Sequence, residues 1–123
     1  MTELDPALRR IISLPTEDFR PYDRFGTVRP GLTWLPLSKE SADGGPGCFA
    51  IRFAPGATSQ LHVHSDVEEF YVLEGELIDS DGGRLKAGDF VSYEAGSQHS
   101  SHAPEGAVIL VFLRVPNQRI DED

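Results

Sequence analysis

The chain has 123 residues, enough for a single domain with one hydrophobic core. It carries 20 acidic and 11 basic residues, and its net charge of −9 argues against nucleic acid or an anionic membrane as a partner. Cys48 is the only cysteine, no apolar run approaches the ~20 residues of a membrane span, and no secretory signal is evident, so we expect a cytoplasmic protein without an internal disulfide.

Residues 1–25 form an N-terminal arm ahead of the first expected strand. Asp5 and Pro6 suit the N-cap and the first position of a helix, and apolar residues follow at Leu8, Ile11 and Ile12. This pattern predicts a short helix that ends before Pro15. The apolar residues of the arm could pack on the outside of the domain or across a dimer interface.

Residues 27–115 show short β segments separated by turns, and residues 116–123 form a polar tail. The segment 48–54 alternates, with Phe49, Ile51 and Phe53 on one face, and the apolar run 107–115 predicts a strand covered on both faces. The expected strands are 32–37, 48–54, 60–65, 69–78, 84–86, 90–93 and 107–115. This pattern predicts one all-β domain over residues 1–123, built as a sandwich or barrel.

A cluster of metal-ligand residue types lies between the middle and the end of the chain. His62 and His64 are separated by one residue, so in a strand they lie on one face, about 6–7 Å apart. Glu68, on the next strand, can supply a third donor. In a barrel His99 can reach the same interior layer, with His102 as the alternative. Imidazole and carboxylate donors suit zinc, iron, manganese and nickel.

Two stretches resemble the two sequence motifs of the cupin family. Gly56 to Gly75 contains His-x-His, then a glutamate and a final glycine six residues on, and this spacing selects Glu68 as the motif glutamate. Gly88 to His99 resembles the second motif and ends on its histidine. The chain departs from the family pattern at Glu94, where proline is usual, and at Ala103, where asparagine is usual.

The resemblance implies a cupin double-stranded β-helix, a jelly-roll barrel with His62, His64, Glu68 and His99 as metal ligands inside it. Residues 68–82, 88–90, 96–99 and 103–106 are similar to a narrower group of ChrR-type cupin domains and small dioxygenases that cleave β-diketones such as acetylacetone or hydroxyacetophenones. Acetylacetone-cleaving members use three histidines alone, so Glu68 is either a ligand or a neighbour of the ligands. The family also implies a homodimer, with Trp34 as a candidate interface residue.

These features favour an enzyme that binds a small-molecule substrate at one divalent transition metal per chain, with Fe(II) favoured and Zn(II), Mn(II) or Ni(II) as alternatives. The leading hypothesis is a mononuclear non-haem dioxygenase acting on a small dicarbonyl or hydroxylated aromatic compound. The alternatives are a zinc-binding regulatory cupin similar to ChrR, and a metal-dependent isomerase or lyase. ChrR-type proteins carry a separate sigma-binding domain, for which about 25 leading residues are too few, which favours an enzyme.

The residues expected to line the substrate pocket follow from strand parity, aromatic character and position near the first motif. The two polar candidates could bind a substrate oxygen. The six candidates are Arg52, Gln60, Phe70, Val72, Tyr93 and Phe112.

Overall fold

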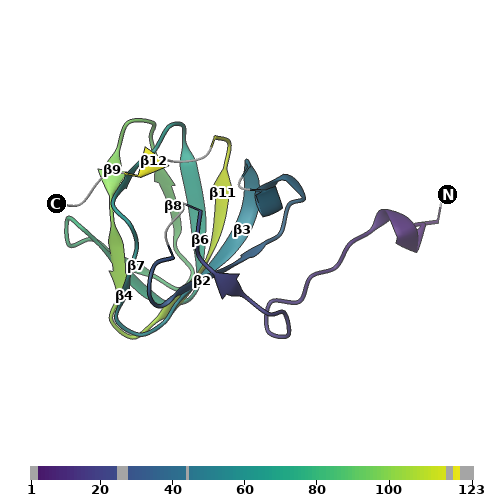
Figure 1. Cartoon of the computed structure of the whole chain (residues 1–123), viewed down its shortest axis with the longest axis horizontal. Helices are drawn as coiled ribbons and strands as arrows, with labels where there is room; N and C mark the ends of the chain where they lie inside the picture. Colours follow the sequence, from purple (N-terminus) through teal and green to yellow (C-terminus); the bar gives the residue numbers. More distant parts are fainter. Residues whose placement is uncertain (1–2, 25–27, 44, 116–117, 120–123) are drawn as a thin grey trace.

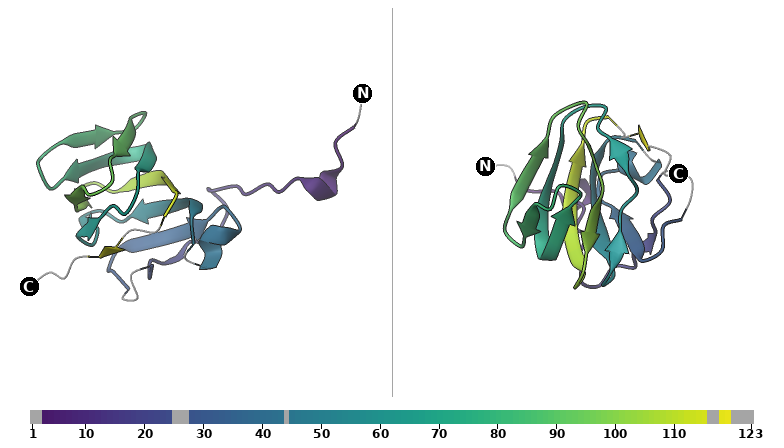
Figure 2. Two further views of the ribbon diagram at one scale, coloured as in Figure 1. Left: turned by 90° about the horizontal axis from the view of Figure 1, so that it is seen from above. Right: turned by 90° about the vertical axis from the view of Figure 1, so that its left-hand side faces the viewer.

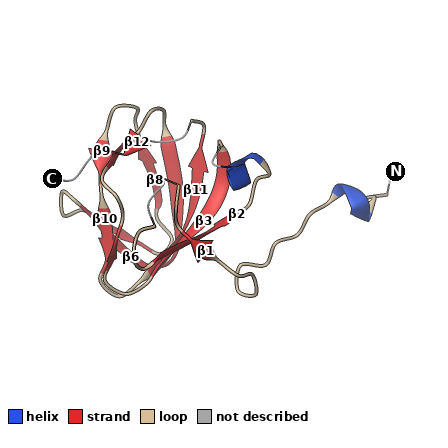
Figure 3. Cartoon of the chain, in the orientation of Figure 1, coloured by secondary structure: helices blue, strands red, loops and turns tan. Residues whose placement is uncertain are grey.

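The computed structural model describes residues 3–24, 28–43, 45–115 and 118–119. These residues form strands and two short 3₁₀ helices, η1 (Pro6–Leu8) and η2 (Glu40–Asp43) (Figure 3). The strands are β1 (Arg20–Pro21), β2 (Leu32–Pro36), β3 (Gly47–Phe53), β4 (Ala57–Thr58), β5 (His62–Val63), β6 (Glu68–Asp79), β7 (Arg84–Lys86), β8 (Phe90–Tyr93), β9 (Gln98–His99), β10 (Ser101–Ala103), β11 (Ala107–Leu113) and β12 (Gln118–Arg119). The expected all-β architecture is confirmed.

The strands curl into an open barrel (Figures 1 and 2). A nine-stranded sheet runs in the order β1-β2-β3-β11-β6-β10-β4, and β7 and β8 also pair with β6. A three-stranded sheet runs in the order β12-β5-β9. Every pairing between the described strands is antiparallel. The two sheets therefore give the jelly-roll barrel that the cupin motifs imply.

The core lies on the inner face of the larger sheet. The predicted alternation of β3 is confirmed, because Phe49, Ile51 and Phe53 are all buried. The expectation that β11 is covered on both faces holds for Val108, which is buried, and fails at Phe112, which points outward and is 41% exposed. The buried side chains on the inner faces of β2, β3, β6 and β11 form one continuous apolar cluster. It includes Leu32, Phe49, Ile51, Phe53, Phe70, Val72, Ile109, Val111 and Leu113.

Strand β6 bends at Gly75 and so contributes to both sides of the barrel. Its first half pairs with β8 and β11, and its second half pairs with β7 and β10. Gly75 has a φ of 74°, a conformation that side chains with a Cβ rarely adopt. A Cβ at this position would also clash with the carbonyl oxygen of Gly106. The bend therefore requires glycine.

The N-terminal arm is more extended than its sequence predicts. A single 3₁₀ turn, η1, forms where Asp5 caps the backbone N–H of Ala7, and the expected helix up to Pro15 is wrong. Leu8 and Ile11 are 83% and 72% exposed, and the arm leads away from the barrel (Figure 1). An isolated helix this short is unstable in water unless its apolar side packs on something, and Leu8 and Ile11 stay exposed against the part of the chain that the structure describes.

Trp34 is part of the core, not of a surface. It is 3% exposed, and the rings of Tyr22 and Phe49 pack edge-on against it. The Arg20 and Arg24 guanidinium groups lie within 5.1 Å of its ring centre. The expectation that Trp34 lies at a dimer interface is therefore wrong.

No helix among the described residues is long and apolar enough to cross a membrane.

Replacing Gly75 by alanine tests the bend of β6. We expect Gly75→Ala to lower the free energy of unfolding by at least about 2 kcal/mol, because a strained φ and a backbone clash act together. Gly82→Ala is the matched control, because Gly82 also has a positive φ of 89° but open space around it. It should cost about 1 kcal/mol. Urea unfolding measures both values, and equal losses would contradict the proposed clash.

Candidate metal centre

Strand pairing brings the two sequence motifs together. His62 on β5 lies directly opposite His99 on β9. His64 follows β5 and is held to the Ser97 turn by two backbone bonds, from His64 N to the Ser97 carbonyl (2.9 Å) and from Gly96 N to the His64 carbonyl (2.8 Å). Glu68 is the first residue of β6. Residues far apart in the sequence therefore meet at one end of the barrel.

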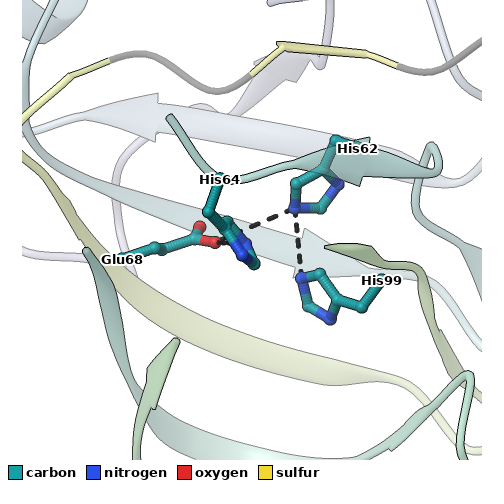
Figure 4. Close-up of side chains that lie close together, drawn as sticks. All are labelled: His62, His64, Glu68 and His99. Atoms are coloured by element: carbon teal, nitrogen blue, oxygen red, sulfur yellow. Dashed lines mark hydrogen bonds and ion pairs between the residues drawn. The ribbon is translucent and has the colours of Figure 1, made fainter. Parts of the chain in front are cut away.

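The side chains of His62, His64, Glu68 and His99 point toward one another (Figure 4). Each offers a ligand atom, and these atoms all lie within 4.8 Å of one another. The Nε2 atoms of His62 and His99 are 3.1 Å apart, and His62 Nε2 is 3.8 Å from Glu68 Oε2. His64 Nε2 contacts the same carboxylate oxygen. All four residues are buried.

The other ring nitrogen of each histidine faces a hydrogen-bond partner. His62 Nδ1 donates to the carbonyl oxygen of Gln60 (2.7 Å), which can only accept. Ser97 Oγ donates to the Glu94 carbonyl, so it accepts from His64 Nδ1 (2.7 Å). His99 Nδ1 donates to Asp79 Oδ1 (3.1 Å). In their neutral forms, all three rings therefore direct the Nε2 lone pair toward the centre of the cluster.

This arrangement fits a bound cation. Two neutral Nε2 atoms that face each other at 3.1 Å have no proton to share, so their lone pairs repel. His64 Nε2 and Glu68 Oε2 are buried and touch each other, but with a neutral His64 no proton joins them, and neither atom has a hydrogen-bond partner among the described residues. Buried polar atoms are normally satisfied, and a cation would satisfy all of these at once. The cluster could therefore hold one metal ion, of a kind that accepts nitrogen and oxygen donors.

The Glu68 carboxyl is ionised at neutral pH. Burial by itself would raise its pKa, but hydrogen bonds and positive charge from His62 and His64 in their protonated forms outweigh burial and lower the pKa to about 2, and with neutral rings a cation in the same place would act in the same direction. A buried negative charge without a full set of hydrogen bonds is costly unless a positive charge balances it. The electrostatics of the site thus favour a divalent cation, in agreement with the geometry.

A cavity of about 70 Å³ lies beside the four residues. His62, Glu68 and His99 form one wall, and the remaining wall is mostly apolar. The other lining residues are Tyr22, Arg24, Leu32, Phe49, Ile51, Phe53, Ser59, Gln60, Phe70, Leu77, Ser101, Ile109, Val111 and Leu113. A metal held by the cluster would face a largely dry space that suits a small apolar molecule.

The structure places the six expected pocket residues in three kinds of environment. Gln60 and Phe70 line the cavity. Val72 is fully buried in the core, and the Tyr93 ring lies 4.8 Å from His64 and 4.3 Å from His99. Neither Val72 nor Tyr93 lines the cavity itself. The last two expected residues lie on the outside of the barrel: Phe112 is exposed, and Arg52 is exposed with its guanidinium group over the ring of Phe19. They face outward because β3 and β11 present their odd-numbered residues inward.

His102 is exposed on β10 and is not part of the cluster. Between the two alternatives, the structure brings His99 and not His102 to the other three residues. Ser101 and Ala103, its neighbours on β10, are buried, so strand alternation turns His102 outward.

Asp79 and Ser97 support the cluster but were not identified from the sequence. Asp79 begins a hairpin turn, in which Gly82 N donates to its carbonyl oxygen (2.8 Å). Strand parity counted back from the turn could have found it, since Leu77 is buried and Asp79 lies on the same face. Parity counted forward from Glu68 fails because the register of β6 against β11 shifts between Val72 and Glu74, which leaves one extra residue on β6.

Comparisons with solved structures show the same fold. Acetylacetone dioxygenase from Acinetobacter johnsonii is 17% identical, with 99% of this chain and 85% of that chain covered and a TM-score of 0.74. The polyketide cyclase RemF from Streptomyces resistomycificus is 18% identical, with coverages of 94% and 88% and a TM-score of 0.74. A chain of the Rhodobacter sphaeroides complex of SigE with the anti-sigma ChrR is 20% identical, with coverages of 82% and 50% and a TM-score of 0.63.

The matched lengths differ between these proteins. The chain spans half of the matched chain in the SigE–ChrR complex, and 65% of a cupin-like protein of unknown function from Ralstonia eutropha. No curated protein matches the chain in sequence. The sequence model of the ChrR cupin-like domain matches residues 20–116, which is most of the chain. The protein therefore belongs to the ChrR cupin-like domain family.

Proposed function

We propose that His62, His64, Glu68 and His99 bind one divalent transition metal per chain, and that the protein is a mononuclear non-haem metal dioxygenase. The observation that carries this proposal is the convergence of four buried donors on one point beside an apolar cavity. The proposed substrate is a small dicarbonyl or hydroxylated aromatic compound. The fold shared with acetylacetone dioxygenase supports this choice.

The chain's own residues would bind, orient and enclose the substrate. The Nδ1 hydrogen bonds hold the three imidazoles in place, and the Glu68 carboxylate balances part of the cation's charge. Four protein ligands leave one or two coordination positions open. Apolar residues such as Phe49 and Phe70 would hold the carbon skeleton and exclude water. Fe(II), when bound, supplies the chemistry of dioxygen, for which the protein provides only ligands and surroundings.

The first prediction concerns the ligands themselves. We expect about one transition-metal ion per chain, and we expect His99→Ala to weaken its binding by at least about 100-fold, more than the loss of an outer hydrogen bond would. His102→Ala is the matched control, three residues away and exposed. Elemental analysis and calorimetric titration measure the content and the affinity. Equal loss in both variants, or none in either, would contradict the proposed ligand set.

The second prediction concerns the reaction. Protein loaded with Fe(II) should consume dioxygen in the presence of a small 1,3-dicarbonyl such as acetylacetone, or a hydroxylated acetophenone, as measured with an oxygen electrode. The zinc-loaded protein and the His99→Ala variant should not. An absence of uptake across a panel of both substrate classes, with one iron bound per chain, would overturn the dioxygenase proposal.

The family match also supports a second candidate, a zinc-binding regulatory cupin. The matching sequence model is that of the ChrR cupin-like domain, and ChrR is an anti-sigma factor in the structure compared above. Zinc retained through extensive dialysis, without uptake of dioxygen in the iron-loaded form, would favour this candidate.

A third candidate, Lewis-acid catalysis without dioxygen, draws support from the shared fold of polyketide cyclase RemF. It predicts substrate turnover under anaerobic conditions.

We also propose that the protein is a homodimer that associates through the outer face of its larger sheet. This face carries four exposed apolar side chains on adjacent strands, and Phe90 lies opposite Tyr71 in the β6–β8 pair. The four residues are Tyr71, Leu73, Phe90 and Phe112. The apolar side chains of the arm, Leu8 and Ile11, are unpacked in the single chain and would be covered in such a dimer.

Light scattering after size exclusion tests the proposed dimer. The wild-type protein should have the mass of a dimer, and the double variant Phe90→Ser/Phe112→Ser should have the mass of a monomer. Arg84→Ser, a change at an exposed residue on β7, is the control and should stay dimeric. A wild-type protein that remains monomeric at high concentration would overturn the dimer.

A further inference from the structure

We propose that Asp79 is the positioning residue of the metal centre: it fixes the orientation and tautomer of His99 and so makes His99 a ligand. This inference rests on the metal centre proposed above. It assigns a role to a residue that neither the cupin motifs nor the spacing of the histidines identifies.

The carboxylate of Asp79 accepts hydrogen bonds from three side chains. Oδ1 accepts from His99 Nδ1 (3.1 Å) and from the hydroxyl of Ser101, and Oδ2 accepts from the Tyr93 hydroxyl (2.6 Å). The side chain of Asp79 is only 12% exposed. Because partners hold both of its oxygens, the carboxylate cannot rotate freely, and its direction toward His99 is fixed.

The Nδ1 partner of His99 differs in kind from those of the other two histidines. Its strand, β9, has two residues, as β5 has, and the pairing of the two strands fixes the backbone of His99 but not the rotation of its ring. His62 is oriented by a main-chain carbonyl, and His64 by the hydroxyl of its neighbouring turn residue Ser97. Among the Nδ1 contacts between the described residues, that of His99 is with a carboxylate, whereas those of His62 and His64 are with uncharged oxygens. A carboxylate partner also makes the imidazole a stronger donor to a metal.

Tyr93 connects this hydrogen-bond network to the rest of the centre. Its hydroxyl donates to Asp79. Its ring stacks on the ring of His64, with the two centres 4.8 Å apart, and its centre lies 4.3 Å from that of the His99 ring. Tyr93 also pairs with Glu68 across β8 and β6. A single residue thus contacts two of the histidines and the strand of the carboxylate ligand, which makes the orientation of Asp79 part of the same rigid unit.

Titration with Co(II), followed by its visible absorption, tests the inference on the full chain. We expect Asp79→Ala to weaken binding about 10- to 100-fold, and Asp79→Asn to weaken it less, because the amide oxygen still accepts from His99. Glu69→Gln is the matched control: it lies on the same strand, pairs with Ser92 and Phe112, and faces away from the cluster. It should bind as the wild type does. Wild-type affinity in both Asp79 variants would overturn the inference.

A double-mutant cycle separates positioning from a general structural role. If Asp79 acts through His99, then Asp79→Ala should cost no further affinity in a protein that already carries His99→Ala. An equal loss in both backgrounds would overturn the inference, because Asp79 would then support the site independently of His99. Asp79→Asn serves in the same cycle if Asp79→Ala does not fold.

The state of the His99 ring in metal-free protein gives a readout that does not depend on metal binding. Long-range ¹H–¹⁵N spectra should show the Nδ1–H tautomer for His99, and Asp79→Ala should alter this signal while leaving His62 and His64 unchanged. An unaltered His99 signal would overturn the inference. A wild-type protein that binds no cobalt but shows the expected His99 change would instead overturn the metal centre and leave the Asp79–His99 link supported.

Discussion

The register of β5 against β9 is the constraint on which the candidate site depends. It places His62 directly opposite His99, with their Nε2 atoms 3.1 Å apart inside the barrel. Two buried neutral imidazoles repel each other at this distance unless a proton or a cation lies between them. A shift of one residue in this pairing would turn one of the rings outward. Folding therefore brings together a cluster whose members are compatible chiefly when a positive charge joins them.

The sequence alone predicts much of this arrangement. Strand alternation and turn residues indicate the all-β fold, and the inward set of β3 is correct because alternation in a half-buried strand reflects the core directly. The group of four that the structure brings together was expected, because the cupin motifs carry both the residue types and their spacing. The number of residues between the motif glutamate and Gly75 favours Glu68 over Glu69, and Glu68 is the one that belongs to the cluster.

Other features depend on contacts that spacing does not encode. An irregularity at Leu73, which lies between the residues that pair with Val108 and Ile109, shifts the inward phase of β6, so parity could not be carried from Glu68 to Asp79. Arg52 and Phe112 have the character of pocket residues but lie on outward positions of their strands. The arm carries a good helix cap, yet only one turn forms, because capping cannot replace the apolar packing that a short helix requires.

The four donor residues of the centre bind the metal, but they do not by themselves determine which reaction it catalyses. Imidazole and carboxylate donors accept several divalent ions, and the same fold is shared by a dioxygenase and a cyclase. What differs between such proteins must lie in the residues around the donors. Here these are a largely apolar cavity wall and a set of Nδ1 partners, one of which is charged. The charge of Asp79 strengthens His99 as a donor, and the apolar wall strengthens every electrostatic interaction within the cavity. Together these two features would tune the bound metal and select among the reactions that the fold permits.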